Sequence, residues 1–228
     1  DEPNVLNGKF TSFYYNGNKQ REGVYNRNVA VGIWKFYFES GGIKMSGPLK
    51  NNQSEGNWKY YFENGNLKMA GNLTRNEKIG EWIFYHENGE IKSIGNYKNN
   101  LKDDVWVYNK ENGDFKAQAD YDNGKGIYYE FYDNGKMKMT GPIEDEKSHG
   151  LWTYYNRDGT IESEGYEKNG LKQGVWEFYY PNGTIKSEGE FNLGKATGNW
   201  KYFHKNGAIK AEGKKKEDFK AVRNVVGV

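Results

Sequence analysis

The side chains that most often perform catalysis or bind metals are few and scattered in this chain of 228 residues. The chain has no cysteine, which excludes thiolate nucleophiles and cysteine-ligated zinc or iron–sulfur sites. His86 and His204 lie far apart in the sequence, His149 lies in a polar loop segment, and no two carboxylates stand out as a general acid and base. We therefore expect no catalytic residue, no metal and no cofactor, and we expect that the protein is not an enzyme.

Aromatic side chains are the chemistry that this sequence does offer, with 7 Trp, 19 Tyr and 12 Phe. One set of rings recurs at regular intervals, and in most copies a lysine follows seven residues later. Regularly spaced rings suit sugar rings, peptide strands or a partner protein, and the lysines suggest that the partner is anionic. The candidate partner-binding ladder consists of Tyr37, Tyr61, Tyr85, Phe131, Tyr155, Tyr179 and Phe203, with Lys44, Lys68 and Lys92 beside it.

The composition limits the kinds of partner and location. The net charge is +2 and the pI is about 8.4, whereas nucleic-acid-binding domains usually have a basic face and a pI above about 9. No run of residues approaches the roughly 18 consecutive apolar residues of a membrane span. The chain begins with Asp1 rather than Met, which would fit a removed leader, so we expect a secreted, periplasmic or cell-surface protein, with a cytoplasmic one as the alternative.

The elements that must position the rings form a repeat of 24 residues. A Gly-x-aromatic triplet marks most copies, as in Gly32-x-Trp34 and Gly56-x-Trp58, and Asp104 replaces the glycine once. Nine repeats start at residues 8, 32, 56, 80, 104, 126, 150, 174 and 198, with a single step of 22 residues where a loop is shortened. We number positions within each repeat from its first residue as position 0.

Two further markers keep the same phase and predict β-hairpins. Positions 8 and 9 are Asn-Gly in most repeats, with Ser-Gly and Asp-Gly once each, and position 15 is glycine except for Ala119. Asn-Gly between alternating apolar segments is the strongest short-range hairpin signal. The sequence therefore predicts an all-β protein, an elongated single-layer meander of nine hairpins over residues 8–221. Residues 1–7 form a head, and residues 222–228 form a tail that we expect to act as a capping strand. The alternatives for this tail are a linker to a further region and a strand for self-association.

The length of the turn decides which residues share a face. A two-residue type I′ turn at Asn-Gly would pair positions 2 with 15, 4 with 13 and 6 with 11, and would place the Trp and the aliphatic position 11 on one buried face. Position 5 and the lysine of position 12 would then pair on the opposite, polar face. Pro181 before Asn182-Gly183 instead suits a type I turn with a glycine bulge, which pairs position 5 with position 11. We prefer the two-residue turn because it separates polar from apolar residues more cleanly.

The repeat resembles the bacterial variant of the MORN repeat, and the segments from Gly80 to Tyr97 and from Gly174 to Phe191 are the clearest copies. The resemblance covers residues 8–221 and implies an elongated sheet of hairpins with no catalytic motif. It also implies a scaffold that binds proteins or lies near membranes, and bacterial members often carry the label of antitoxin. The fifth repeat departs most from the pattern, because Asp104, Asn109 and Ala119 replace three of its marker residues.

The expected function is that of a non-enzymatic repeat scaffold for protein–protein interaction, exported or surface-exposed in a bacterium. One alternative is a surface module that binds glycan or cell wall through the aromatic ladder, and another is an antitoxin or immunity protein. The ladder also has a purely structural interpretation, in which the rings cover lysine stems and pack against neighbouring repeats. In that interpretation the acidic residues of position 7 pair with the lysines across the strands. The oligomeric state and the identity of the partner are not predicted.

Overall fold

The computed structural model describes residues 5–215, and these residues form twenty strands and no helix. The chain divides into two compact units, residues 1–126 and 127–228. Unit 1 contains β1 (Gly8–Phe13), β2 (Lys19–Asn26), β3 (Val29–Tyr37), β4 (Ile43–Lys50), β5 (Gln53–Ser54), β6 (Gly56–Tyr61), β7 (Leu67–Thr74), β8 (Glu77–Tyr85), β9 (Ile91–Lys98), β10 (Leu101–Asn109) and β11 (Phe115–Asp122). Unit 2 contains most of β12 (Lys125–Phe131), and then β13 (Met137–Glu144), β14 (Lys147–Ser148), β15 (Gly150–Tyr155), β16 (Ile161–Lys168), β17 (Leu171–Tyr179), β18 (Ile185–Asn192), β19 (Lys195–Phe203) and β20 (Ile209–Lys215).

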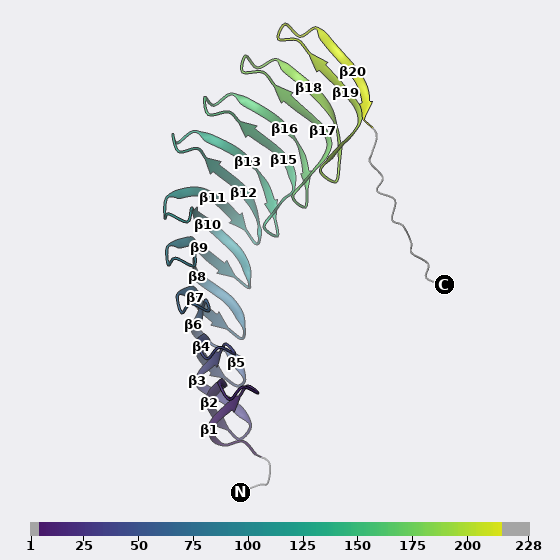
Figure 1. Cartoon of the computed structure of the whole chain (residues 1–228). Coiled ribbons are helices and arrows are strands. Elements are labelled where there is room, and N and C mark those ends of the chain that lie inside the picture. The colour runs from purple at the N-terminus through teal and green to yellow at the C-terminus, as the bar shows by residue number, and fades with distance from the viewer. Residues whose placement is uncertain (1–4, 216–228) are drawn as a thin grey trace, which may run out of the picture. The chain divides into compact units, whose positions relative to one another are not determined.

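The predicted all-β meander is confirmed: within each unit, successive strands pair antiparallel, except that the short β5 and β14 each share a partner strand with the strand that follows (Figure 1). Nine hairpins would give eighteen strands, and the two extra ones arise where position 16 is Pro48 or Pro142. The carbonyl of each proline accepts from a backbone N–H, of Glu55 at 3.0 Å and of His149 at 2.9 Å, but the proline has no N–H to return the bond. A two-residue strand, β5 or β14, is therefore separated from the strand that follows it. The predicted tail, residues 222–228, lies outside the described residues.

The predicted two-residue turn at Asn-Gly is wrong, and the structure forms the three-residue alternative. In the eighth repeat, Gly183 N–H donates to Tyr180 O and Tyr180 N–H donates to Thr184 O, both at 2.8 Å, around the loop Pro181-Asn182-Gly183. Gly183 has a φ of 82°, which a type I turn with a glycine bulge requires at this place. Proline fits the first loop position of such a turn because its φ is fixed near −65°.

A second irregularity restores the pairing that the two-residue turn had predicted for the tryptophans. Tyr179 pairs with Ile185, but Phe178 pairs with Ser187, so Lys186 at position 12 is an extra residue in a β-bulge. The same shift occurs in every hairpin whose pairing is described in full. Trp still lies opposite the glycine of position 15, as in the two-residue register. Position 11 therefore shares a face with position 5, and the expectation that position 11 lies with the Trp is wrong.

The two faces of the sheet consequently carry different sets of positions, and we name each face after its rings. The tryptophan face carries positions 2, 4, 13 and 15, and the tyrosine face carries positions 3, 5, 11 and 14. On the tryptophan face the rings of positions 2 and 4 alternate in a continuous ladder, with Trp82 6.2 Å from Tyr60 and 6.3 Å from Phe84 between ring centroids. The Trp side chains are almost fully buried in a sheet of one layer, because each packs against rings of its own and of the preceding repeat.

The glycine at position 15 permits this packing. Trp82 lies over Gly71 of the preceding repeat, and a Cβ built on Gly71 would overlap the indole. The same overlap would arise at the corresponding glycines of the other repeats that precede a Trp, Gly23, Gly47, Gly95, Gly141, Gly165 and Gly189. Glycine is therefore required here because the indole of the next repeat occupies the space of a side chain.

The tight turns between hairpins lie in the segments that the sequence marks only as polar loops. Asn51 and Asn52 both have positive φ, 52° and 64°, as a two-residue type I′ turn requires. Asn52 also ties its turn to the preceding one, because its N–H donates to Ala30 O at 3.2 Å and its Oδ1 accepts from Ala30 N–H at 2.7 Å. The shortened step keeps such a turn at Asn123-Gly124, but Gly126 after it is not left-handed, unlike most leading glycines.

Candidate functional site

The seven rings of the predicted ladder lie on the tyrosine face of their units, at position 5. All seven are half-buried. They are Tyr37, Tyr61 and Tyr85 in unit 1, and Phe131, Tyr155, Tyr179 and Phe203 in unit 2. The fifth repeat has Asn109 at this place, and its side-chain amide donates to Ile91 O at 3.1 Å.

Two of these tyrosines are tied to carboxylates of the same face. Tyr37 donates to Glu22 Oε1 at 2.6 Å, and the hydroxyl of Tyr179 lies 2.7 Å from Glu164 Oε1 and 2.5 Å from Glu177 Oε2. Burial and then the bond to Glu22 raise the pKa of Tyr37 to about 12, and the same causes raise the pKa of Tyr179 still further. These phenols therefore remain neutral donors and help to fix the sheet.

The lysines predicted to pair with the ladder lie on the tryptophan face instead. Because position 12 is the bulged residue, Lys44 and Lys68 turn toward the rings of position 6, with Nζ 5.9 Å from the Phe38 centroid and 5.5 Å from that of Phe62. Lys92 is the extra residue between Ile91 and Ser93 in the same way. The structure therefore does not bring the lysines and the tyrosine ladder together, and the expected pairing of position 5 with position 12 is wrong.

An open pocket of about 400 Å³ lies on the tryptophan face between the first two repeats, beside Lys44. It is lined by Tyr14, Gln20, Arg21, Phe36, Tyr37, Lys44 and Met45. The hydroxyl of Tyr14 donates to Tyr37 O at 2.8 Å, so the ring at the mouth of this pocket is fixed by the next repeat. The lining holds no arrangement of nucleophile and base.

The middle of the tyrosine face is a central row in which positions 3 and 14 of successive strands pair directly. In unit 1 this row becomes apolar, and Ile94 stands between Ile83 and Val107. Ala70 pairs with Ile83 at the start of the apolar part. In unit 2 the same positions are polar and mostly charged: Thr140, Thr153, Glu164, Glu177, Glu188, Lys201 and Glu212 follow one another as direct partners.

Position 1 is a feature of the tyrosine face that sequence reasoning missed. It carries large apolar side chains that remain exposed, among them Ile33 at 61%, Val105 at 50% and Val175 at 59%. The signal was available, because position 1 precedes the buried Trp and must point to the other side of the strand. The tyrosine face is thus more apolar than the polar face with one ladder of rings that the sequence predicts.

A second missed feature is a set of lysines that cover the tryptophans. Lys172 Nζ lies 3.8 Å from the Trp176 centroid and within 5.7 Å of three more rings, and burial lowers its pKa. Lys78 and Lys102 cover Trp82 and Trp106 in the same way. Each of these lysines lies two residues before a repeat that has a ring at position 17, namely Phe191, Tyr97 and Tyr121. The same place is Ala or Ser before repeats that have Leu, Glu or Lys at position 17. Cation and rings form one packed unit, which identifies these lysines as structural.

The histidines do not come together. His86 Nε2 lies 3.2 Å from Asn109 O of the next repeat, and His149 packs at 6.3 Å from the Tyr166 ring. Within residues 5–215 no group of three His, Cys, Asp or Glu side chains could hold a metal ion. The same part of the chain contains no helix long and apolar enough to cross a membrane.

Comparison with known proteins supports a family and little else. No curated protein matches the chain. The crystal structure of TcdB2-TccC3 is similar to 85% of this chain at 12% sequence identity, with a TM-score of 0.21. This chain spans 12% of the length of that solved chain, and a TM-score so low supports no conclusion about either protein.

A family model described as the MORN repeat variant matches eight segments, residues 6–27, 30–51, 54–73, 78–99, 125–145, 148–169, 172–193 and 196–214. The unmatched gap contains the fifth repeat, whose strands β10 and β11 nevertheless form and bury Trp106 completely. The matched segments cover well over half of the chain, in phase with the hairpins of the structure. The chain therefore belongs to the family of the MORN repeat variant.

Proposed function

We propose that the chain is a non-enzymatic repeat scaffold whose tyrosine face in unit 1 binds another protein. The observation that carries the proposal is the apolar part of the central row, Ala70, Ile83, Ile94 and Val107. Exposed apolar side chains border it, with Val105 50% exposed and Phe115 47% exposed. Contiguous apolar surface on a folded protein usually marks a site of interaction.

The fold does not demand this apolar row. Unit 2 forms the same hairpins with Thr153, Glu164 and Glu177 at the equivalent positions. Both units bury their tryptophans on the other face, so the apolar core is complete without the row. Apolar side chains retained where polar ones suffice are explained by a surface that is covered in a complex.

A protein fits this surface better than a glycan does. Sugar-binding platforms present open ring faces, whereas the ladder rings are half-buried. The hydroxyl of Tyr37 also donates its hydrogen bond to Glu22 of the same sheet. The aliphatic side chains of the row are half-buried as well, and the exposed side chains that border them, Val105 and Phe115, complement the apolar side chains of a polypeptide.

The test is a paired substitution with a matched control in the other unit. Ile83→Lys with Ile94→Glu replaces a direct apolar pair by an ion pair, and Thr153→Lys with Thr140→Glu makes the same change at positions 3 and 14 of unit 2. Protein captured from an extract of the source organism is quantified by mass spectrometry, and hydrogen exchange verifies that both variants are folded. We expect the first variant to lose the captured partner and the second to retain it.

Equal capture by both variants contradicts the proposal. Binding in a glycan array that paired Tyr61→Ala and Tyr85→Ala abolish, with no effect of the Ile83 and Ile94 changes, supports the glycan alternative instead. Selective capture of a toxin by the unit 1 row makes the scaffold an antitoxin or immunity protein.

A further inference from the structure

We propose that the two ends of the array bind each other between copies, so that β1 of one copy adds to the open edge of β20 of a second copy. The contact lies at the ends of the array and does not involve the tyrosine face of unit 1, so it is independent of the proposed function. Three contacts between neighbouring repeats end at the last hairpin, and the first hairpin offers what each of them lacks.

The first contact is the ring over the glycine of position 15. Gly189 lies under Trp200 of the following repeat, as six earlier glycines lie under their tryptophans. Gly213 in β20 is the last glycine of this series, and within residues 5–215 no atom lies within 4 Å of a Cβ built there. Among the residues that the structure describes, the site over Gly213 for a ring at position 2 is therefore vacant.

The second contact is a ladder of asparagines at the turns. The side-chain amide of position 8 donates to the carbonyl of position 7 in the next repeat, from Asn88 to Glu111 O at 2.6 Å and from Asn134 to Arg157 O at 3.0 Å. The last repeat has Asn206 at this position, and its Oδ1 accepts from Ala208 N–H as its equivalents do. Within residues 5–215 no hairpin follows to offer a carbonyl to this amide.

The third contact joins position 6 to the carbonyl of position 5 in the next repeat. Tyr180 donates its hydroxyl hydrogen to Phe203 O at 2.9 Å, and His86 Nε2 lies 3.2 Å from Asn109 O. The last repeat has His204 at position 6, the same residue type as His86. The last hairpin thus keeps the side chains of all three contacts.

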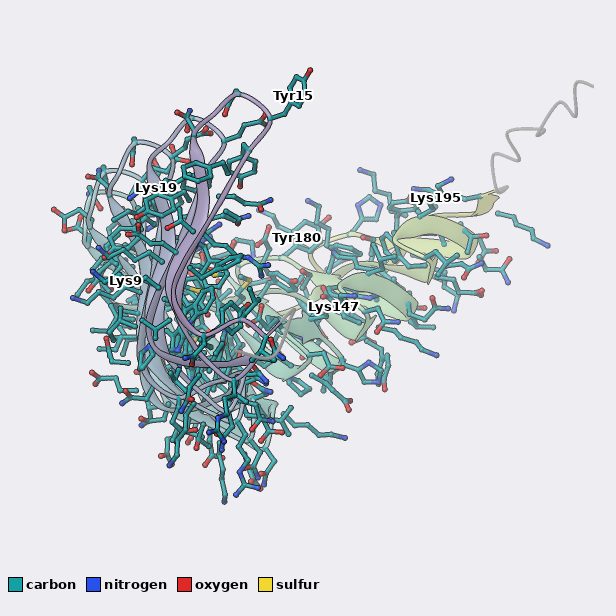
Figure 2. The ribbon with its side chains drawn as sticks, turned by 90° about the horizontal axis from the view of Figure 1, so that it is seen from below. Lys9, Tyr15, Lys19, Lys147, Tyr180 and Lys195 are labelled. Atoms are coloured by element: carbon teal, nitrogen blue, oxygen red, sulfur yellow. The ribbon has the colours of Figure 1, made fainter. Side chains whose placement is uncertain are left out.

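The first hairpin carries the complementary groups. Phe10 stands at position 2 of β1 on the tryptophan face, where its ring lies 6.1 Å from that of Trp34, and no described strand precedes β1. The carbonyls of Phe13 and Tyr15 occupy positions 5 and 7 of this repeat. The Tyr15 side chain is fully exposed and points away from the ribbon (Figure 2), so the turn that bears it is open to a neighbour.

The first repeat carries a ring, Phe10, at the position whose ring fills the equivalent site in the other repeats. A second copy is therefore the occupant that fits the site over Gly213. The expected register places Phe10 opposite Gly213 and Ser12 opposite Ala211, as Trp200 pairs with Gly189 and Tyr202 with Ser187. Such strand addition is a head-to-tail contact, which forms open chains of copies or closed rings.

Sedimentation of the full chain over micromolar to millimolar concentrations tests the contact. We expect the mass of the wild-type protein to rise with concentration, and Gly213→Thr to lower the association constant by about tenfold or more because it fills the site for Phe10. Gly42→Thr is the matched control, since a Cβ at Gly42 also meets nothing within 4 Å and threonine occupies the same position in two other repeats, at Thr160 and Thr184. A wild-type protein that stays monomeric, or association that Gly213→Thr leaves unchanged, overturns the proposal.

Cross-linking tests the register in a chain that has no native cysteine. A mixture of the single variants Ser12→Cys and Ala211→Cys should form disulfide-linked dimers on mild oxidation, and the double variant should form longer multimers. Neither should form when Lys59→Cys replaces Ser12→Cys. Equal cross-linking with Lys59→Cys, or none with Ser12→Cys, overturns the proposed pairing of β1 with β20, and loss of this contact leaves the test of the unit 1 surface unaffected.

Discussion

The second half of unit 1 and unit 2 carry different side chains in the central row of the tyrosine face, although the backbone that supports the row is the same. In the first half of unit 1 the row is polar, with Glu22 opposite Lys35. In unit 1, Ile94 pairs directly with Ile83 and Val107. In unit 2, Glu177 pairs directly with two other glutamates, Glu164 and Glu188. Carboxylates directly opposite one another repel, so this arrangement opposes folding of unit 2.

Local contacts offset the repulsion in unit 2. The hydroxyl of Tyr179 lies between Glu164 and Glu177, and Lys201 forms an ion pair with Glu188 at 3.2 Å. The tryptophan face, by contrast, hardly differs between the units, because both have the same ladder of alternating rings over the glycines of position 15. The tryptophan face therefore specifies the fold, whereas the tyrosine face accommodates different side chains on the same backbone.

The largest expected effect tests the part that the units share. Gly71→Ala in unit 1 and Gly165→Ala in unit 2 each place a methyl group inside the indole of the next repeat, and we expect each to lower the free energy of unfolding by about 3 kcal/mol. Urea unfolding measures the total change, and hydrogen exchange of the neighbouring strands locates it. The control Gly213→Ala should change stability by less than about 0.5 kcal/mol, because nothing described lies near it. A large loss in one unit only would contradict the common role of this face.

The second effect exchanges the chemistry of the two central rows. Ile94→Glu introduces a carboxylate between two apolar partners and should destabilise unit 1 by about 2 kcal/mol. Glu177→Ile removes two like-charge pairs and should stabilise unit 2 by roughly 0.5 to 1 kcal/mol, less in high salt. Denaturant unfolding at low and high ionic strength measures both. If both substitutions destabilise their units equally, the expectation that Glu177→Ile stabilises unit 2 is wrong.

Much of the fold could be predicted from the sequence because three markers share one period. Asn-Gly at positions 8 and 9 and glycine at position 15 have direct physical causes, a left-handed turn residue and an indole that fills the space of a side chain. The bulge at position 12 could not be predicted, since Ile-Lys at positions 11 and 12 fits either register until the turn length is known. Pro181 carried the relevant signal, because its fixed φ suits the first loop position of a three-residue turn.

The candidate site was predictable only in part for the same reason. The rings from Tyr37 to Phe203 share position 5, and equal spacing alone places them on one side of each sheet. Lys44 was placed beside them because a regular hairpin brings position 12 opposite position 5, and one extra residue moves it to the other face. The apolar central row was missed because Ile83 and Ile94 are not part of the repeat's consensus, and a search for shared positions passes over features confined to one unit.

A third, smaller effect compares the phenol contacts of the units. Tyr37 is neutral when folded, and its pKa is raised from 10.0 to about 12, so its stabilising contribution is fully present below pH 10 and is lost as the pH rises through about 12. We expect Tyr37→Phe to cost about 1 kcal/mol below pH 10 and less above about pH 12. The contribution of Tyr179, whose pKa is raised further by burial and by two carboxylates, should persist to higher pH. The difference in unfolding free energy between each Phe variant and the wild type across this range measures both, and identical profiles would contradict the stronger coupling in unit 2.

The smallest expected effect concerns the last repeat of unit 1. Asp104 adopts a φ of 57° at position 0, where most repeats have a left-handed glycine such as Gly80 at 62°. A residue with a Cβ is strained in this region, although aspartate tolerates it better than most, so Asp104→Gly should stabilise unit 1 by roughly 0.5 kcal/mol. The reverse substitution, Gly80→Asp, should cost about as much, and thermal unfolding of the pair measures both changes. Because position 0 lies in the same conformation in unit 2, Gly174→Asp should match Gly80→Asp, and a different cost there would show that the units differ in backbone as well as in surface.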